Sequence, residues 1–304
     1  MDQTQDAPPA IAAPILSGLS AIADRYDVVL CDVWGVLHNG QACYGAACEA
    51  LTRFRAKGGT VVLITNAPRP NGPVREQMDL IGVPGTAYDD VVTSGDVTIA
   101  AIAERGDAPV FHIGPPRDLA LFDEVEKLAG RHPRLRPLGD ADYVVVTGLF
   151  QETADTPETY DPELTLMRER DLTMICANPD LVVHIGTELR YCAGAIAERY
   201  RKQGGRVVYA GKPHAPIYDR ALDLAATHRG EATPLSRVLA IGDALHTDVA
   251  GAVLQGIDVL FVTNGIHRDE THRTGDGQLD PDAYEAMIRE AEHRPLAAMA
   301  GLSW

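Results

Sequence analysis

The sequence predicts an α/β protein, in which helices cover a Rossmann-like parallel sheet and a second α/β unit is inserted into that core. Short β-branched runs alternate with longer helical patterns near both ends of the chain. Such alternation is typical of βαβ units, whose strands are parallel. Late strand runs are almost continuously apolar, as expected for strands that are buried on both faces. One sheet can therefore hold strands from both ends of the chain.

The elements follow from these patterns in chain order. The first set has expected strands at 27–31, 59–65 and 89–94 and helices at 47–58 and 74–83, and the last set has strands at 204–211, 237–243 and 258–265 and helices at 216–228 and 246–256. Between the two sets lie strands at 108–114, 142–148 and 172–178, in a stretch long enough for a separate unit. We expect a loose segment at 1–19, the core at 20–94 and 206–304, and the inserted unit at 95–205.

Composition narrows the class of protein. The chain has 304 residues, 45% of them hydrophobic, which is sufficient for a large core. A formal charge of −16 disfavours binding to nucleic acid or to an anionic membrane. The acidic amino terminus does not resemble a signal peptide, and no apolar run reaches the roughly 18 residues of a membrane span. Five cysteines without a C-x-x-C pair disfavour a disulfide framework or a zinc site. We expect a cytoplasmic protein that acts on small metabolites.

Polar side chains gather where four of the expected core strands end. They are Asp32 after VVLC, Thr65 and Asn66 after VVLI, Lys212 after RVVYAG, and Asp243 and Asp248 in LAIGDALHTDVAG. Open α/β sheets bind ligands at the carboxyl ends of their strands. A single acid after a strand is often only a helix cap. Together, however, a carboxylate nucleophile, a hydroxyl donor, a cation and further acids are the groups needed to bind a divalent metal and a phosphoryl group.

These residues lie in four motifs, which are DVWGVLHNG, ITNAPRP, AGKPHAPIYDRAL and IGDALHTDVAGA, with NPD at 178–180. In this order the motifs resemble the haloacid dehalogenase (HAD) superfamily, over about residues 26–267. They are most similar to subclass IIA, with its NagD-like and p-nitrophenyl phosphatase-like enzymes, in which a large α/β cap lies between the second and third motifs. The resemblance implies a HAD core, a cap at 95–205 and a Mg²⁺-dependent phosphatase, that is, a phosphoric monoester hydrolase.

The resemblance also implies a role for each motif residue. Asp32 would attack phosphorus and form an aspartyl-phosphate. Thr65, the backbone amide of Asn66 and Lys212 would bind the phosphoryl group. The implied Mg²⁺ ligands are the carboxylates of Asp32, Asp243 and Asp248 and the backbone carbonyl of Trp34. Mg²⁺ suits this set chemically, because it prefers carboxylate and phosphate oxygens.

Trp34 departs from the family pattern. The matching residue in the family's phosphatases is usually a second aspartate, which protonates the leaving oxygen and then activates water, whereas an indole N–H does not exchange protons near neutral pH. A general acid or base typically contributes about 10²- to 10⁴-fold, so a slowed phosphatase is expected. Three alternatives stay open: a phospho-ligand-binding or regulatory protein of weak activity, a metal-independent dehalogenase, or replacement of the missing acid by His38 or His214.

Substrate choice is expected to lie in the cap, because a core that binds only the phosphoryl group does not recognise the rest of the molecule. The expected substrate-binding residues are Arg69, Asn178, Asp180, His184, Glu188, Arg190 and Tyr191. Each has an alternative interpretation as an ordinary solvated side chain. The substrate is expected to be a small phosphorylated metabolite, with a sugar phosphate, a nucleotide or pyridoxal phosphate all open. Homodimerisation through the cap is common in the families that the chain resembles.

Overall fold

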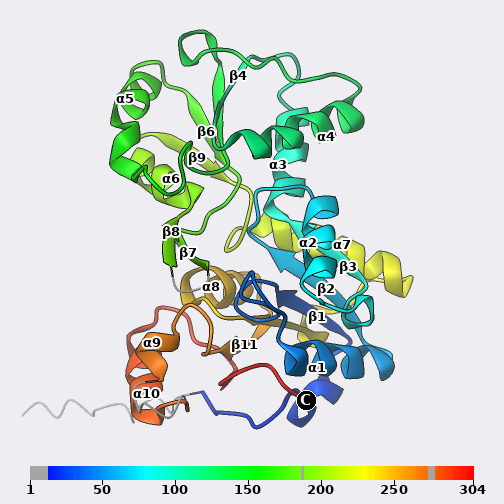
Figure 1. Cartoon of the computed structure of the whole chain (residues 1–304). Coiled ribbons are helices and arrows are strands. Elements are labelled where there is room, and N and C mark those ends of the chain that lie inside the picture. Colours follow the sequence, from blue (N-terminus) through cyan, green and yellow to red (C-terminus); the bar gives the residue numbers. More distant parts are fainter. Residues whose placement is uncertain (1–12, 186–187, 273–277) are drawn as a thin grey trace, which may run out of the picture.

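The core of the protein is a six-stranded sheet in which every strand is parallel to its neighbours. The computed structural model describes residues 13–185, 188–272 and 278–304. The strand order is β12-β11-β10-β1-β2-β3, so that strands from the two ends of the chain share one sheet (Figure 1). Their bounds are β1 Val28–Asp32, β2 Thr60–Thr65, β3 Asp90–Thr93, β10 Val238–Gly242, β11 Asp258–Val262 and β12 Ala297–Met299.

Both faces of this sheet are buried, which explains the continuous apolar runs. Side chains alternate along a strand, so Val29 and Cys31 of β1 join one apolar cluster and Val28 and Leu30 join the other. The first face is covered by α1 (Gly45–Ala56) and α2 (Asn71–Leu80). The second is covered by α7 (Ala215–Arg229), α8 (Ala250–Leu254) and α10 (Pro281–Glu290), and the short α9 spans Arg268–Thr271. The expected Rossmann-like core is confirmed.

The inserted cap has its own parallel sheet, with the order β4-β5-β6-β9. It stands above the core in Figure 1 and is connected to it by α3 (Ser94–Ala103), which begins at a capping box between Thr93 and Asp96. The other cap elements are β4 Val110–Ile113, β5 Tyr143–Val146, β6 Thr173–Cys176, β9 Arg206–Tyr209, α4 Ala120–Ala129, α5 Asp161–Glu169 and α6 Ala193–Lys202. A two-stranded antiparallel hairpin, β7 (Val182–Ile185) and β8 (Glu188–Tyr191), lies between the cap and the core (Figure 1).

One strand was expected in the wrong sheet. The segment 204–211 was assigned to the core, but β9 pairs in parallel with β6 of the cap. The chain passes from β6 through the β7–β8 hairpin and the helix α6 to β9, and such a helical crossover places the second parallel strand beside the first. β9 is an edge strand of the cap sheet, and its residues alternate between exposed and half-buried. The other domain boundaries stay predictions.

Residues 1–19 were expected to be loose, and this expectation is wrong for residues 13–19, which the structure describes. The backbone of Leu16 donates a hydrogen bond to the carbonyl of Ala298 at 2.8 Å, and Leu19 is fully buried in the core. Residues 1–12 lie outside the described residues. Among the described residues, no helix is both long and apolar enough to span a bilayer.

Candidate active site

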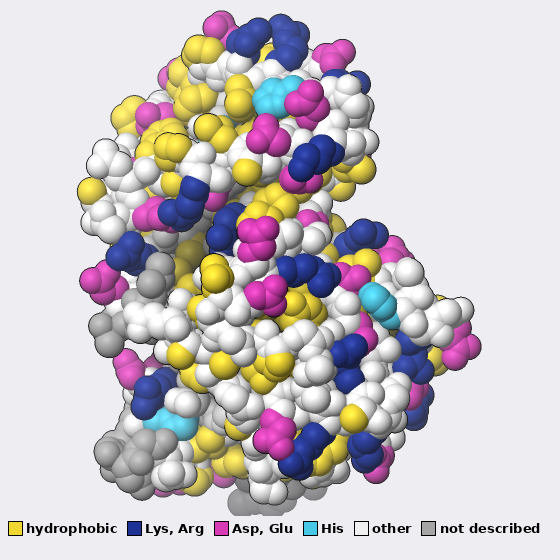
Figure 2. Space-filling view, turned by 45° about the vertical axis from the view of Figure 1, so that its right-hand side comes forward, with side chains coloured by type: hydrophobic (Ala, Val, Ile, Leu, Met, Phe, Trp, Pro, Cys, Tyr) yellow, Lys and Arg dark blue, Asp and Glu magenta, His cyan; other side chains and the backbone are white. Residues whose placement is uncertain are grey.

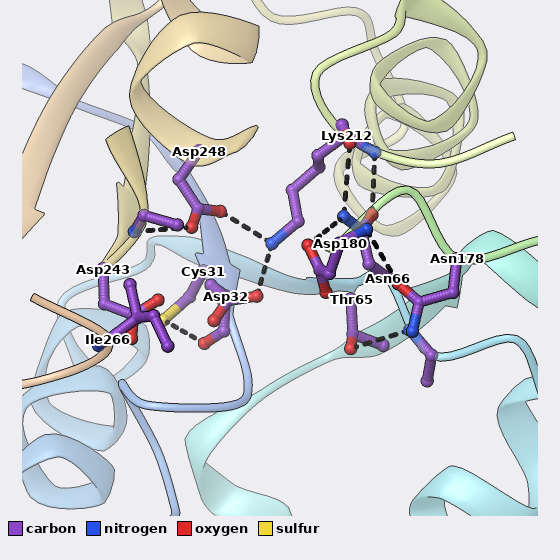
Figure 3. A network of polar contacts seen from close by, with 12 residues as sticks. Cys31, Asp32, Thr65, Asn66, Asn178, Asp180, Lys212, Asp243, Asp248 and Ile266 are labelled. Carbon is purple, nitrogen blue, oxygen red and sulfur yellow. Dashed lines mark hydrogen bonds and ion pairs between the residues drawn. The ribbon is translucent and has the colours of Figure 1, made fainter. Parts of the chain in front are cut away.

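Three neighbouring strands of the core bring the predicted acids and the threonine together. Asp32 is the last residue of β1 and Thr65 is the last of β2, while Asp243 directly follows the end of β10. Because these strands are adjacent and parallel, all three side chains reach the same edge of the sheet. Asp248 joins them from a π-helical turn at Leu245–Val249. Figure 3 shows these side chains converging on one region.

Lys212 enters this region from the cap side. It follows β9, the edge strand of the cap sheet, and not a core strand as expected. Its ammonium group forms ion pairs with the carboxylates of Asp32 and Asp248, the latter at 2.6 Å. Burial by itself would lower the pKa of Lys212, but Asp248 and Asp32 raise this pKa well above its usual value. The lysine is therefore a fixed positive charge beside the predicted nucleophile.

The side chain of Asn66 connects the core loop, Lys212 and the cap. Its amide oxygen accepts a hydrogen bond from the backbone N–H of Lys212 at 2.8 Å. Its amide nitrogen donates to the backbone carbonyl of Lys212 at 3.2 Å and to the carboxylate of Asp180 at 2.8 Å. Asn66 is almost fully buried, so these bonds are shielded from water and position both partners. From sequence alone, only the backbone amide of Asn66 was expected to take part in the site.

Three buried carboxylates form a cluster with the chemistry of a magnesium site. One oxygen from each of Asp32, Asp243 and Asp248 lies within 4.8 Å of the others. Burial, together with the charge of Asp248, raises the pKa of Asp243 to about 7. A divalent cation would offset this repulsion, and carboxylate oxygens are its preferred ligands. A Cβ added at Gly35 or Gly265 would collide with the Asp243 carboxylate, which is therefore tightly enclosed. The cluster fits the expected metal.

A cavity of about 340 Å³ opens above these groups. It contains the predicted residues Asp32, Trp34, Thr65, Asn66, Asp180, Lys212, Asp243 and Asp248. Its remaining walls include residues that the sequence analysis missed, among them Asn39, Tyr44, Val182, Val183, Ile266 and Arg268. Ile266 and Arg268 follow the carboxyl end of β11, and this position was a signal that could have found them. Tyr44 and the two valines carried no such signal.

Comparisons with known proteins agree with this geometry. The family model for "haloacid dehalogenase-like hydrolase" matches residues 29–127, and a second HAD-like hydrolase model matches residues 209–291. A crystal structure of a haloacid dehalogenase-like hydrolase from Brucella suis 1330 is 44% identical, with a TM-score of 0.82, and the match covers 95% of this chain and 100% of that one. The chain belongs to the haloacid dehalogenase-like hydrolase family.

Curated relatives within this HAD family are more distant. The 5′-nucleotidase YutF of Bacillus subtilis is 26% identical, over 86% of this chain and 96% of the relative. The D-glycerol 3-phosphate phosphatase of Mycobacterium tuberculosis is 29% identical, over 91% of this chain and 70% of the relative. Together with the fold, the comparisons confirm the HAD resemblance and are consistent with subclass IIA.

At Trp34 this HAD site has an aromatic wall. The indole ring packs edge-on against His38, with ring centroids 5.1 Å apart, and Gly40 approaches it so closely that a Cβ there would collide with the ring. The His38 side chain is buried, and its Nδ1 accepts a hydrogen bond from the Gly40 amide at 3.0 Å. His214 stacks on Tyr209 of the cap. Neither histidine is among the described residues that line the cavity.

The other predicted substrate residues whose side chains are described are not among the residues that line the cavity. Arg69 donates to Gln77 at 2.5 Å, and the Asn178 side chain accepts from the backbone of Asp180 at 3.0 Å. On β8, Glu188 and Arg190 form an ion pair with each other at 2.7 Å. Tyr191 is exposed, and the side chain of His184 lies outside the described residues. Their contact with substrate stays a prediction.

Proposed function

We propose that this HAD-family hydrolase is a Mg²⁺-dependent phosphatase that acts on a small phosphorylated metabolite through an aspartyl-phosphate at Asp32. The observation that carries the proposal is the ion pair between Lys212 and Asp32, inside a cavity that also contains the acid cluster. Both curated relatives described above have names that identify them as enzymes acting on phosphorylated metabolites. This supports the same chemical class of substrate here.

The metal would be held by the carboxylates of Asp32, Asp243 and Asp248, and the carbonyl of Trp34 remains a proposed fourth ligand. When bound, Mg²⁺ supplies positive charge that offsets the negative charge of the acids and of the phosphoryl oxygens. The chain controls this site through hydrogen bonds that orient the acids. Asp243 accepts from the backbone of Ile266 at 2.7 Å, and Asp248 accepts from that of Ala244 at 3.1 Å.

The residues of the chain would perform the transfer as follows. A carboxylate oxygen of Asp32 attacks phosphorus, and the Lys212 ammonium balances negative charge on both groups. The hydroxyl of Thr65, at the end of the neighbouring strand, donates a hydrogen bond to a phosphoryl oxygen. Water then hydrolyses the aspartyl-phosphate and restores Asp32. Trp34 cannot exchange a proton at either step, so the position after β1 contributes an aromatic wall and a backbone carbonyl only.

The cavity sets the size and character of the leaving group. A volume of about 340 Å³ suits a small metabolite. Its outer walls combine the aromatic rings of Trp34 and Tyr44 with the guanidinium of Arg268. We propose that the substrate presents an apolar or planar part to these rings and a hydrogen-bond acceptor to Arg268. A sugar phosphate, a nucleotide and pyridoxal phosphate all remain within this class.

The test is phosphate release from p-nitrophenyl phosphate and a panel of metabolites, with and without Mg²⁺, by the parent and by Asp32→Asn. We expect release that needs both the metal and Asp32. Ligand-induced thermal stabilisation without turnover would indicate a phospho-ligand-binding protein and not an enzyme. This outcome is worth testing because Trp34 stands where the usual acid is lost. Halide release without metal would indicate a dehalogenase.

A further inference from the structure

The site lacks an acid where the family resemblance implies one, and Asp180 is a carboxylate in the same cavity whose role is open. We propose that Asp180 transfers the proton to the leaving oxygen and later accepts one from the attacking water, in place of the aspartate that Trp34 replaces. This inference rests on the phosphatase function proposed above. It assigns a catalytic role to a residue of the cap side and not of the core motif.

One carboxylate oxygen of Asp180 accepts a hydrogen bond that holds the residue in the site, and the other can exchange a proton with a substrate or a water. It lies in the loop between β6 and β7, and its Oδ1 accepts from the Asn66 side chain at 2.8 Å. Its Oδ2 has no hydrogen-bond partner among the residues that the structure describes. Asp180 lines the cavity together with Asp32 and Lys212, and Figure 3 shows it beside Asn66, to which it is hydrogen-bonded. A carboxyl group in this position reaches the same enclosed space as the nucleophile.

The surroundings of Asp180 raise its pKa, so that this carboxyl group takes up a proton more readily than a free one. Burial raises the pKa of Asp180, the charge of Lys212 and the hydrogen bond from Asn66 oppose this shift, and Asp248 raises the pKa further. The titratable groups that interact with it are Lys212, Asp243 and Asp248 around the metal cluster, and the cap thiols Cys176 and Cys192. Burial also raises the pKa of both thiols, which keeps them neutral. A bound phosphoryl group would add negative charge and raise the pKa of Asp180 again.

The proton balance of the two half-reactions is complete with Asp180 alone. In the first, an Asp32 oxygen bonds to phosphorus, the ester P–O bond breaks, and the leaving oxygen takes the proton of Asp180. In the second, a water oxygen bonds to phosphorus and the bond to Asp32 breaks, while Asp180 accepts a proton from that water. The products are the alcohol and inorganic phosphate, and both carboxyl groups return to their starting states.

The alternatives for this role are weaker in the structure. Burial lowers the pKa of His38 to about 4, and the Nδ1 atom of this ring already accepts a hydrogen bond. His214 is exposed and stacks on Tyr209. Asp243 and Asp248 belong to the metal cluster, and Asp248 is also paired with Lys212. Of the two described acids of the cavity wall that lie outside the metal cluster, Asp269 is exposed, whereas Asp180 is half-buried and held by Asn66.

The test compares Asp180→Asn with the parent on two probes, p-nitrophenyl phosphate and glycerol 3-phosphate. Asparagine can still accept the hydrogen bond from Asn66, so the fold should be kept. We expect kcat for glycerol 3-phosphate to fall about 100-fold or more. With p-nitrophenyl phosphate, whose leaving group needs no proton, rapid-mixing measurements should still show a stoichiometric burst of p-nitrophenolate, followed by slow turnover. The decline of the parent's kcat at high pH should be absent in the variant.

Two further variants distinguish a loss of proton transfer from a general effect of the substitution on the structure. Asp107→Asn makes the same charge change on the cap surface, where the side chain is 80% exposed, and should leave both rates unchanged. Asp180→Glu should restore part of the glycerol 3-phosphate activity. Loss of the burst from Asp180→Asn, or parental rates and pH profile in that variant, would overturn the proton-transfer role. A parent whose phosphate release does not depend on Asp32 would instead overturn the proposed function, and this role with it.

Discussion

The Asn66 side chain accepts a hydrogen bond at 2.8 Å from the backbone amide of Lys212, a residue 146 positions away in sequence. Asn66 lies in the second core motif, directly after β2, and Lys212 lies where the chain returns from the cap to the core. Because Asn66 also donates to Asp180, a single amide group orients the cation of the site and a carboxylate of the cap side. The geometry of the candidate site and the position of the cap are therefore coupled through one buried side chain.

The first prediction concerns this coupling. Asn66→Ala removes three hydrogen bonds and leaves buried polar groups unpaired, so we expect the free energy of unfolding to fall by about 1–3 kcal/mol. Because Lys212 loses its support, kcat should fall similarly for aryl and alkyl phosphates, unlike in Asp180→Asn. Urea unfolding and steady-state kinetics measure both effects. Asn71→Ala, outside the described cavity wall, is the control and should keep its kcat. Parental kcat in Asn66→Ala would contradict the coupling.

The second prediction concerns the acid cluster. The pKa of Asp243 is higher in the folded than in the unfolded chain, so the folded chain holds a proton that the unfolded chain has lost. This contribution to the free energy of unfolding falls as the pH rises toward and through about 7. At pH 8 without Mg²⁺, Asp243→Asn should therefore be more stable than the parent, on the order of 1 kcal/mol. Addition of Mg²⁺ should stabilise the parent and have little effect on the variant. Thermal unfolding with and without the metal measures this. Equal Mg²⁺ stabilisation of both proteins would exclude Asp243 as a ligand.

The third prediction concerns the leaving group. Trp34 cannot donate the proton that an alkoxide needs, so an alkyl ester depends on proton transfer from the cap side by Asp180. We expect the parent to hydrolyse p-nitrophenyl phosphate, which needs no such transfer, with a higher kcat than glycerol 3-phosphate. An acyl phosphate should behave like the aryl ester, since its leaving group is also weakly basic. Phosphate release at saturating substrate measures the ratio. Equal kcat values for alkyl and aryl esters would show that the replacement at Trp34 has no effect on leaving-group chemistry.

The fourth prediction concerns acid stability. Burial lowers the pKa of His38 to about 4, so the unfolded chain binds a proton between about pH 6.5 and 4 that the folded chain does not. This group therefore makes the fold less stable as the pH falls through that range, by about 2 kcal/mol between pH 7 and pH 5. His38→Asn keeps an acceptor for the Gly40 amide and should reduce the difference between the two pH values. An unchanged difference in urea unfolding would reject this source of acid sensitivity.

Charged side chains gather on the surface where the cap meets the core. Figure 2 shows acidic and basic side chains close together where the molecule narrows. The cap residue Arg117 pairs with Glu152 and lies 3.7 Å from the buried carboxylate of Asp118. Charge from Arg69 of the core opposes the burial that raises the pKa of Asp118. This interaction between charges is a second connection between a core loop and the cap, besides the hydrogen bonds of Asn66.

Local sequence patterns determined most of the fold and the catalytic edge. Continuous apolar runs identified the buried parallel strands, and polar residues at their ends identified Asp32, Thr65 and Asp243, because side-chain burial and strand direction are local consequences of sequence. The residues of β9 do not determine locally to which of the two sheets this strand belongs. Its run of alternating exposure is compatible with either sheet, and only pairing with β6 decided it.

The sequence by itself therefore determined the HAD core, the inserted cap and the core acids of the site, because each depends on a motif or a period within a few residues. Tertiary structure alone decided which distant groups meet them. Asn66 binds Lys212 and Asp180 across more than 100 residues of chain, and Tyr44, Val183 and Arg268 come from separate elements to one cavity. Such contacts depend on how the cap packs on the core, which is a property of the whole chain and not of any segment.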